Sequence, residues 1–272
     1  MMNNFKLYFM LAVTFAVFLL TPAELPAEEP DPARLAYESY RTAYLPGDDV
    51  RWQATMRIED RRGNVRTREL TLLRKNTGED RQKYYSYFRQ PADLRRMVFM
   101  VHTYPGDDDD RWLYLPAMDM VQRITGRQKR NSFAGSNFTY EDMTGRHPEA
   151  DTFAYVGMDH IDGETVDIIR GNPKDEDLVE FSYYEMHISR ETKLPVKGVF
   201  YTPGGDKHRT LTLEEWEEID GYVTPTVQKA KNHRTEGHTV AEMSDIEYDL
   251  GIGEDIFTER YLRRPPTRWI EP

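Results

Sequence analysis

The spacing of apolar residues divides the chain into one predicted helix and a long series of predicted strands. Between residues 36 and 44 the apolar positions recur at helical spacing, which predicts an amphipathic helix. Asp31 is suited to cap this helix, Pro32 suits its first position, and Pro46-Gly47 ends it. The residues of the apolar stripe are Ala36, Tyr37, Tyr40, Ala43 and Tyr44.

From residue 48 onward the apolar period changes to two residues, as expected of half-buried strands. Clusters of Gly, Pro, Asn and Asp separate the segments, and several are short enough to be hairpin turns. About eleven or twelve strands in meander order would form one large antiparallel sheet, which must curl, split or close. Thirteen segments are the candidates for these eleven or twelve strands: residues 48–59, 65–75, 83–89, 97–104, 111–115, 121–124, 152–156, 164–170, 178–189, 195–202, 208–219, 222–232 and 239–248.

One segment, residues 116–148, interrupts this regularity and is rich in Gly, Ser, Asn and Arg. Loops of this length are commonly functional or act as lids. No interior linker follows, so residues 28–272 are expected to form one domain.

The N-terminal residues have the pattern of an export signal. Lys6 precedes an uncharged, largely apolar run over residues 7–20, which is shorter than the roughly twenty residues of a membrane-spanning helix. The pattern predicts a signal peptide over residues 1–27, with cleavage after Ala23 or Ala27. An uncleaved anchor helix is the alternative.

The chain contains no cysteine, which excludes disulfides, thiolate zinc sites, cysteine nucleophiles and a lipobox cysteine. Exported eukaryotic domains are often rich in disulfides. The sequence therefore favours a bacterial periplasm and a protein that is not a lipoprotein.

Acidic residues number 47 against 36 basic ones, for a net charge of −11. A general nucleic-acid-binding face is unfavourable with this charge, and contact with an anionic membrane would be transient only. Aromatic residues make up 12% of the chain, which indicates a folded protein because disordered chains contain few.

No nucleophile elbow, phosphate loop, dinucleotide fingerprint or His-Glu-x-x-His motif occurs. We therefore expect no catalytic residues, no cofactor and no metal. The alternative is a metal-dependent hydrolase, in which His208, His233 and His238 meet across strands or Asp107 to Asp110 collect a cation. The acidic run over residues 214–218 is expected to be a solvated strand edge, because neighbouring strand residues face opposite ways.

A composite of motifs resembles one known family. Trp112-Leu113-Tyr114-Leu115-Pro116-Ala117, Val121-Gln122-Arg123-Ile124 and the run from Ser132 to Met143 are similar to the LolA-like outer membrane lipoprotein-sorting proteins. A looser resemblance extends from about residue 70 to residue 263.

The resemblance implies a mainly β, LolA/LolB-like fold: one strongly curved antiparallel sheet, an incomplete barrel, with an N-terminal helix and a loop or helix lid over an apolar cavity. It also implies a periplasmic carrier that shields lipid or lipoprotein acyl chains, with an RND-type membrane transporter as a candidate partner. Moving an acyl chain through water requires shielding worth on the order of 10 kcal/mol, at about 0.8 kcal/mol per methylene. The loop 116–148 is longer than in the dedicated lipoprotein chaperone, which leaves the cargo open.

The inward positions of the predicted strands are the candidates for the cavity lining. They are Trp52, Met56, Ile58, Leu70, Leu72, Phe99, Val101, Trp112, Tyr114, Phe181, Tyr183, Val199, Tyr201, Leu211, Leu213 and Trp216. Periodicity alone does not distinguish an open cavity from a packed core. The alternative function is therefore a non-catalytic envelope interaction module that partners a membrane transporter and has a filled core.

We place the lid over residues 123–143. Its aromatic residues Phe133, Phe138 and Tyr140 are expected to cover the cavity mouth. Its basic residues could meet an anionic lipid head group, an acidic partner or the surrounding carboxylates. These basic residues are Arg123, Arg127, Lys129 and Arg130.

Overall fold

The computed structural model describes residues 29–271, so the predicted signal peptide lies outside the described residues. Helix α1 (Pro32–Tyr44) begins where the sequence predicts, with the Asp31 side chain accepting a hydrogen bond from the Ala33 amide at 3.0 Å. Within residues 29–271, no helix is both long enough and apolar enough to cross a bilayer.

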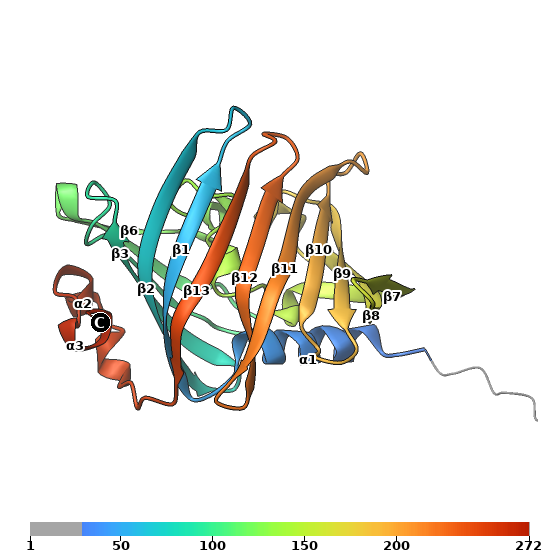
Figure 1. Cartoon of the computed structure of the whole chain (residues 1–272), viewed down its shortest axis with the longest axis horizontal. Helices are drawn as coiled ribbons and strands as arrows, with labels where there is room; N and C mark the ends of the chain where they lie inside the picture. The colour runs from blue at the N-terminus through green and yellow to red at the C-terminus, as the bar shows by residue number, and fades with distance from the viewer. Residues whose placement is uncertain (1–28, 272) are drawn as a thin grey trace, which may run out of the picture.

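The remainder of the chain is dominated by one antiparallel sheet of thirteen strands (Figure 1). The predicted mainly β fold class is confirmed. The strands are β1 (Asp49–Glu59), β2 (Val65–Gly78), β3 (Arg81–Gln90), β4 (Val98–His102), β5 (Asp110–Leu115), β6 (Met120–Arg123), β7 (Asp151–Ile161), β8 (Glu164–Pro173), β9 (Tyr183–Ser189), β10 (Pro195–Tyr201), β11 (Lys207–Ile219), β12 (Tyr222–Asn232) and β13 (His238–Tyr248).

Local sequence explains the hairpins. Asp162-Gly163 and Asp220-Gly221 close the β7–β8 and β11–β12 hairpins, and all four residues have positive φ. An Asp-Gly pair suits a tight hairpin turn of this kind because both central residues are left-handed. Residues 178–182 were predicted to begin a strand, but β9 begins only at Tyr183 and a 3-10 turn, Glu176–Leu178, precedes it.

The predicted meander order is wrong at one point. Strands β1 to β6 and β7 to β13 form two meanders, which β1 and β13 join by pairing with each other, for example Met56 opposite Ala241. Strands β6 and β7 are consecutive in the chain but form the two opposite edges of the sheet. Apolar periodicity reports which residues lie in strands, not which strands pair, so it does not reveal this arrangement.

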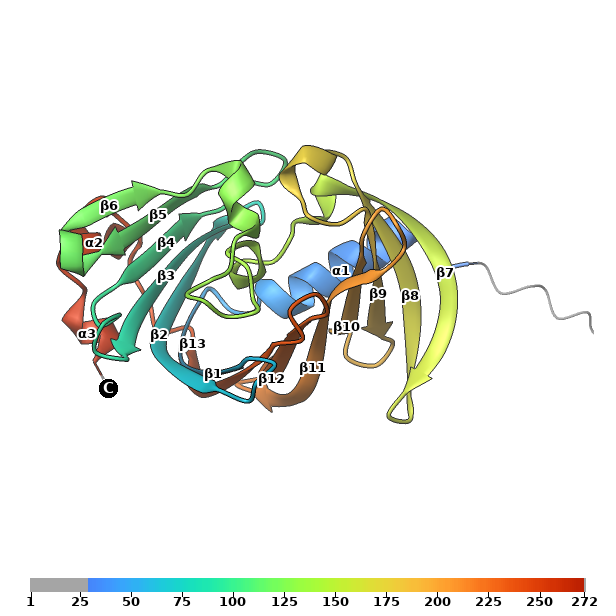
Figure 2. The same cartoon turned by 90° about the horizontal axis from the view of Figure 1, so that it is seen from above.

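Seen from above, the sheet forms an open trough (Figure 2). Helix α1 lies on its concave side against β7, β8, β10 and β12. The segment between the edge strands, residues 124–150, also crosses this side, and we call it the crossing segment. It contains three 3-10 turns: η2 (Gly126–Arg130), η3 (Glu141–Met143) and η4 (Pro148–Ala150).

The sheet buries apolar side chains on both faces near β2 to β5. On the concave face Leu70, Phe88 and Phe99 pack against the crossing segment. The convex face is covered by the C-terminal residues, which include η6 (Glu254–Ile256), α2 (Glu259–Arg263) and α3 (Thr267–Ile270). The convex core consists of Leu73, Tyr85, Val98, Met100, Trp112, Tyr114, Ile252, Ile256, Phe257, Leu262 and Ile270.

This second core corrects one prediction. Trp112 and Tyr114 were predicted to line the cavity, but both lie in the convex core, and Leu113 between them lies in the concave one. Both faces of β5 are apolar, so its alternation gives no indication of which face points inward.

A buried carboxylate ties the C-terminal segment to the sheet. Asp49 has no exposed surface, and its two carboxylate oxygens accept hydrogen bonds from the amides of Leu250 and Ile252 at 2.8 and 2.9 Å. Lys75 lies 3.3 Å from the same carboxylate. Hydrogen bonds to an ionised group are among the stronger ones in proteins, so Asp49 determines where the chain leaves β13 for the convex face.

A buried ion-pair network holds the crossing segment on the sheet. Glu141 lies 2.8 Å from Lys129 and 2.9 Å from Arg146, and Arg146 lies 2.7 Å from Asp151 at the start of β7. Tyr184 of β9 donates to the same Asp151 carboxylate at 2.8 Å. Burial alone would raise the pKa of Glu141, but the charges and hydrogen bonds of Arg146 and Lys129 outweigh burial and lower it.

Replacing Asp49 by alanine should destabilise the fold by about 2–3 kcal/mol, because two buried amides lose a charged acceptor. Urea unfolding followed by circular dichroism measures this change. The matched control is Asp48→Ala, since Asp48 is exposed whereas the adjacent Asp49 is buried. Equal stabilities for the two variants would contradict the role of Asp49.

Glu141→Gln should destabilise the protein by roughly 3 kcal/mol at pH 7, because it removes the negative charge from a buried pair. Because the pKa of Glu141 is lowered in the folded protein, Glu141 contributes more stability at high pH than at low pH. The ionised Glu141 stabilises the fold above its unfolded-state pKa of about 4.3, and this stabilisation is lost as the pH falls through the folded-state pKa. Urea unfolding should therefore show the wild-type advantage shrinking below about pH 4.3. A constant difference between pH 7 and pH 3, or an equal effect of the exposed control Glu176→Gln, would refute this prediction.

Candidate functional site

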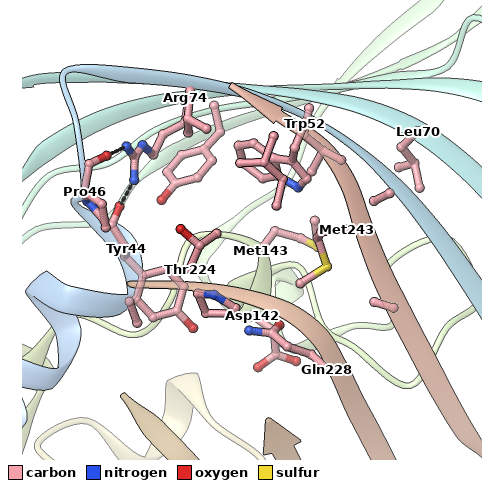
Figure 3. A pocket seen from close by; sticks show the side chains of 18 of the residues that line it. Tyr44, Pro46, Trp52, Leu70, Arg74, Asp142, Met143, Thr224, Gln228 and Met243 are labelled. Carbon is pink, nitrogen blue, oxygen red and sulfur yellow. Dashed lines mark hydrogen bonds between the residues drawn. The ribbon is translucent and has the colours of Figure 1, made fainter. Parts of the chain in front are cut away.

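A cavity of about 150 Å³ lies on the concave face where the two meanders meet (Figure 3). We call it chamber 1. Its floor consists of β1, β2, β12 and β13, and the crossing segment covers it with Phe138, Asp142 and Met143. The lining is mainly apolar and includes Val50, Trp52, Ala54, Met56, Leu70, Leu72, Pro225, Ala241, Met243 and Ile246.

A second cavity of about 140 Å³, chamber 2, adjoins the first between α1 and strands β9 to β12. Tyr44, Phe138, Asp142 and Gln228 line both chambers and therefore form the partition between them. Its other lining residues include Ala36, Tyr40, Phe153, Tyr184, Met186, Phe200, Leu211 and Leu213. Side chains from the helix, the sheet and the crossing segment thus line two adjoining, mainly apolar spaces.

Aromatic residues of the crossing segment cap the concave core. Phe133 is fully buried, with ring centroids 5.6 Å from Phe88 and 5.6 Å from Phe99, and Tyr140 lies 4.9 Å from Phe99. Phe138 lines both chambers. Of the three predicted lid aromatics, only Phe138 contacts the cavities, and the other two anchor the segment.

Polar contacts join the crossing segment to strands β2, β11 and β13. The Asn137 side chain donates to Thr239 Oγ1 at 3.0 Å, and Arg68 donates to the Ala134 carbonyl at 3.3 Å. Arg209 of β11 pairs with Asp142 at the partition, and both side chains are about nine-tenths buried. Opening the cavity from this side requires breaking these contacts.

The structure brings part of the predicted lining together. Trp52, Met56, Leu70 and Leu72 line chamber 1, while Leu211 and Leu213 line chamber 2. The remaining predicted residues of the concave side are buried nearby without lining either chamber. These are Ile58, Phe99, Val101 and Phe181.

Other predicted lining residues lie elsewhere. Tyr183 and Tyr201 stack on each other 4.7 Å apart beside Arg170, away from the chambers. Val199 alternates with Gly198 and Phe200, which line chamber 2, so it faces the convex side.

Trp216 is 42% exposed and borders a surface groove with Arg190 and Glu191. A β-bulge between Leu213 and Trp216 shifts the alternation, and a period of two cannot predict such a shift.

Several chamber residues were not predicted at all. Tyr44 belongs to the apolar stripe of the predicted helix, and Met243 is an alternating apolar residue of a predicted strand. The sequence pattern could therefore have identified both. Phe138 was predicted as a lid residue, but its neighbours Asp142 and Met143 were not singled out, because irregular loops have no period.

The predicted basic cluster is engaged within the chain. Arg123 pairs with Asp110, Lys129 with Glu141 at 2.8 Å, and Arg127 with Asp177 at 3.9 Å. Arg130 donates to the Val179 carbonyl at 3.0 Å. Of the three alternatives for these residues, the structure shows pairing with surrounding acceptors.

A different arginine lines chamber 1. Arg74 is only 4% exposed and donates to the carbonyl oxygens of Tyr44 and Pro46 (Figure 3). Burial lowers its pKa, although a guanidinium stays charged at neutral pH. Burial also raises the pKa values of the neighbouring Tyr44 and Tyr84, so both phenols are neutral.

The histidines do not assemble. His208 lies 3.7 Å from Glu180, His238 lies 3.9 Å from Glu59, and His233 hydrogen-bonds Thr210 at 2.8 Å. In the part of the chain that the structure describes, no group of three or more His, Asp or Glu side chains could hold a metal ion. The Asp107–Asp110 run is engaged partly by Arg111, which pairs with Asp108 and Asp109.

Comparisons with known proteins agree with this geometry. The family model that matches residues 80–264 is described as "-like: Uncharacterized protein". A DUF1329 family protein from Desulfovibrio piger is 26% identical, with a TM-score of 0.78 over 86% of this chain and 100% of that one. A putative outer membrane lipoprotein-sorting protein domain from Vibrio parahaemolyticus is also 26% identical, with a TM-score of 0.80 over 86% of this chain and 98% of that one.

A more distant likeness supports the fold alone. A LolA superfamily protein from Nitrosomonas europaea is 16% identical, with a TM-score of 0.67 over 85% of this chain and 100% of that one. A search of the curated proteins found no match. The chain therefore belongs to the family that the matching model describes, and its fold is that of the LolA-like outer membrane lipoprotein-sorting proteins, the family that its motifs resemble.

Proposed function

We propose that this protein is a periplasmic carrier that shields a lipid or lipoprotein acyl chain in chambers 1 and 2 during transfer toward the outer membrane. The observation that carries the proposal is a pair of adjoining apolar cavities beneath a segment that polar contacts join to the strands. An ordinary core is packed without voids of this size. An apolar cavity stays dry and favours apolar ligands.

The physical requirement of a carrier fits this arrangement. Moving an acyl chain out of water is favourable by about 0.8 kcal/mol per methylene. This hydrophobic stabilisation has no preferred direction, so the site can accept chains of different shape. Met143 and Met243 are flexible side chains in the lining, and methionine adapts to irregular ligands. The work proposed for this site is burial and release, with no catalytic step.

The similarity to a lipoprotein-sorting domain supports this choice of cargo class. The N-terminal pattern of residues 1–27 supports export to the periplasm, and the chain has no cysteine for lipid attachment. An RND-type membrane transporter is the donor or acceptor that we propose from the family resemblance. Contact with either membrane would be transient.

Filling chamber 1 should abolish the uptake of acyl chains. Met243→Trp places a larger, rigid side chain into the cavity, at a stability cost of about 1–3 kcal/mol. We expect the variant to lose at least tenfold in affinity for a fluorescent sixteen-carbon fatty acyl probe, measured by fluorescence titration.

The matched control is Glu242→Trp, because Glu242 is the exposed neighbour on the opposite face of β13. This control should bind the probe like the wild type. If Met243→Trp also binds normally, the acyl chain does not use chamber 1. If the delipidated wild type binds no probe, the interaction-module function replaces the carrier function.

Locking the crossing segment to the sheet should block exchange. Asn137 Nδ2 and Thr239 Oγ1 are 3.0 Å apart, and the chain has no other cysteine, so Asn137→Cys with Thr239→Cys offers a single disulfide. We expect the oxidised variant to take up and release the probe at least tenfold more slowly, with dithiothreitol restoring both rates. Unchanged rates in the oxidised form would show that the segment is not the lid.

A further inference from the structure

Arg74 is a buried cation in a predominantly apolar chamber. It is 4% exposed and lines chamber 1, and within residues 29–271 no carboxylate oxygen lies within 4.0 Å of its guanidinium nitrogens. The carboxylates that influence it most, Asp49 and Asp249, are engaged elsewhere by backbone amides. Buried charges in proteins are normally paired, because an unpaired one costs several kcal/mol.

The protein compensates this charge only in part. The two terminal nitrogens donate to the carbonyls of Tyr44 and Pro46, at the C-terminal end of α1, where the helix dipole is negative. The third nitrogen, Nε, is buried and has no hydrogen-bond partner. One N–H of a buried, charged guanidinium is therefore left without an acceptor, on a side chain that lines chamber 1.

Chamber 1 has a polar end and an apolar end. Leu70, Leu72 and Arg74 follow one another on the concave face of β2 (Figure 3), with Arg74 about 13 Å from Leu70 at about 3.3 Å per residue. Tyr84 lies directly opposite Arg74 on β3, and Thr224 and Tyr248 hydrogen-bond each other at the same end. Met56 and Ala241 pair with each other farther along, toward the apolar end.

The volume restricts the ligand further. Each chamber measures about 150 Å³ or less, which is about the size of a cavity that holds benzene. Chamber 1 therefore holds only part of one long acyl chain, whose remainder extends into chamber 2 or out of the chamber mouth, and several chains on one glycerol do not fit. Carboxylates and phosphates both match a guanidinium edge, and the carboxylate is the smaller of the two.

We propose that chamber 1 binds a single-chain amphiphile with a carboxylate end, a long-chain fatty acid, with the carboxylate on Arg74 and the tail along Leu72, Leu70 and Met56. This inference rests on the proposed carrier function and names its substrate class. The carboxylate supplies the missing counter-ion, and the apolar end shields the methylenes.

The test compares three ligands of one chain length on the wild-type protein. Palmitate, hexadecanol and methyl palmitate are titrated against the delipidated protein by displacement of the fluorescent acyl probe. We expect palmitate to bind at least tenfold more tightly than both neutral ligands. Equal affinities for the three would overturn the role of Arg74 while leaving the carrier function standing, whereas no binding of any would refute the carrier function itself.

Substitutions test whether Arg74 is the residue that binds the carboxylate. Arg74→Met should abolish the preference for palmitate and leave hexadecanol binding within about threefold, while Arg74→Lys should retain part of the preference. The matched control is Arg57→Met, because Arg57 is exposed on β1 and lies outside the chamber lining; this variant should retain the full preference. A preference that survives in folded Arg74→Met, or that is lost in Arg57→Met, would contradict the proposal. If Arg74→Met does not fold, the wild-type ligand series and the Arg74→Lys variant still test whether the carboxylate binds at Arg74.

Discussion

The pairing of β1 with β13 is the interaction on which the rest of the structure depends. It joins the two meanders into one sheet and leaves β6 and β7 as widely separated edges. Chamber 1 lies across this seam, since Trp52 and Leu70 come from one meander and Met243 from the other. Loss of this pairing would separate the walls of the cavity.

The two edges then determine what closes the trough. The chain must travel from β6 to β7, and it does so over the concave face, which places the crossing segment above the chambers. The segment is held by a buried charge network around Glu141 and by the Arg209–Asp142 pair, while its aromatic residues fill the concave core. Detaching this cover therefore requires breaking these polar contacts and also exposing Phe133, Phe138 and Tyr140.

The sequence predicted the elements better than their arrangement. The N-terminal helix, its Asp31 cap and the positions of most strands followed from periodicity and turn residues, because these features are local. The motifs over residues 112–143 predicted the family and, through it, the curved sheet. The pairing of β1 with β13 is set by contacts between residues far apart in the chain, which a local pattern does not contain.

Site residues were predictable only where the sequence shows clearly which alternate residues of a strand face the buried side. Trp52, Met56, Leu70 and Leu72 alternate with polar residues and were placed correctly on the concave face. Trp112 and Tyr114 belong to a strand with two apolar faces, and Trp216 follows a bulge. Arg74 was missed because a charged residue at an inward position reads as a break in the pattern, whereas here it marks the polar end of the chamber.

The proposed function depends on a lipid that binds in the chambers. Native mass spectrometry of the mature protein purified from a bacterial periplasm, followed by extraction and identification of any bound molecule, tests it most directly. We expect one bound amphiphile per protein molecule, with a single acyl chain. A protein that is consistently free of lipid, and that takes up no acyl probe after gentle delipidation, would contradict it.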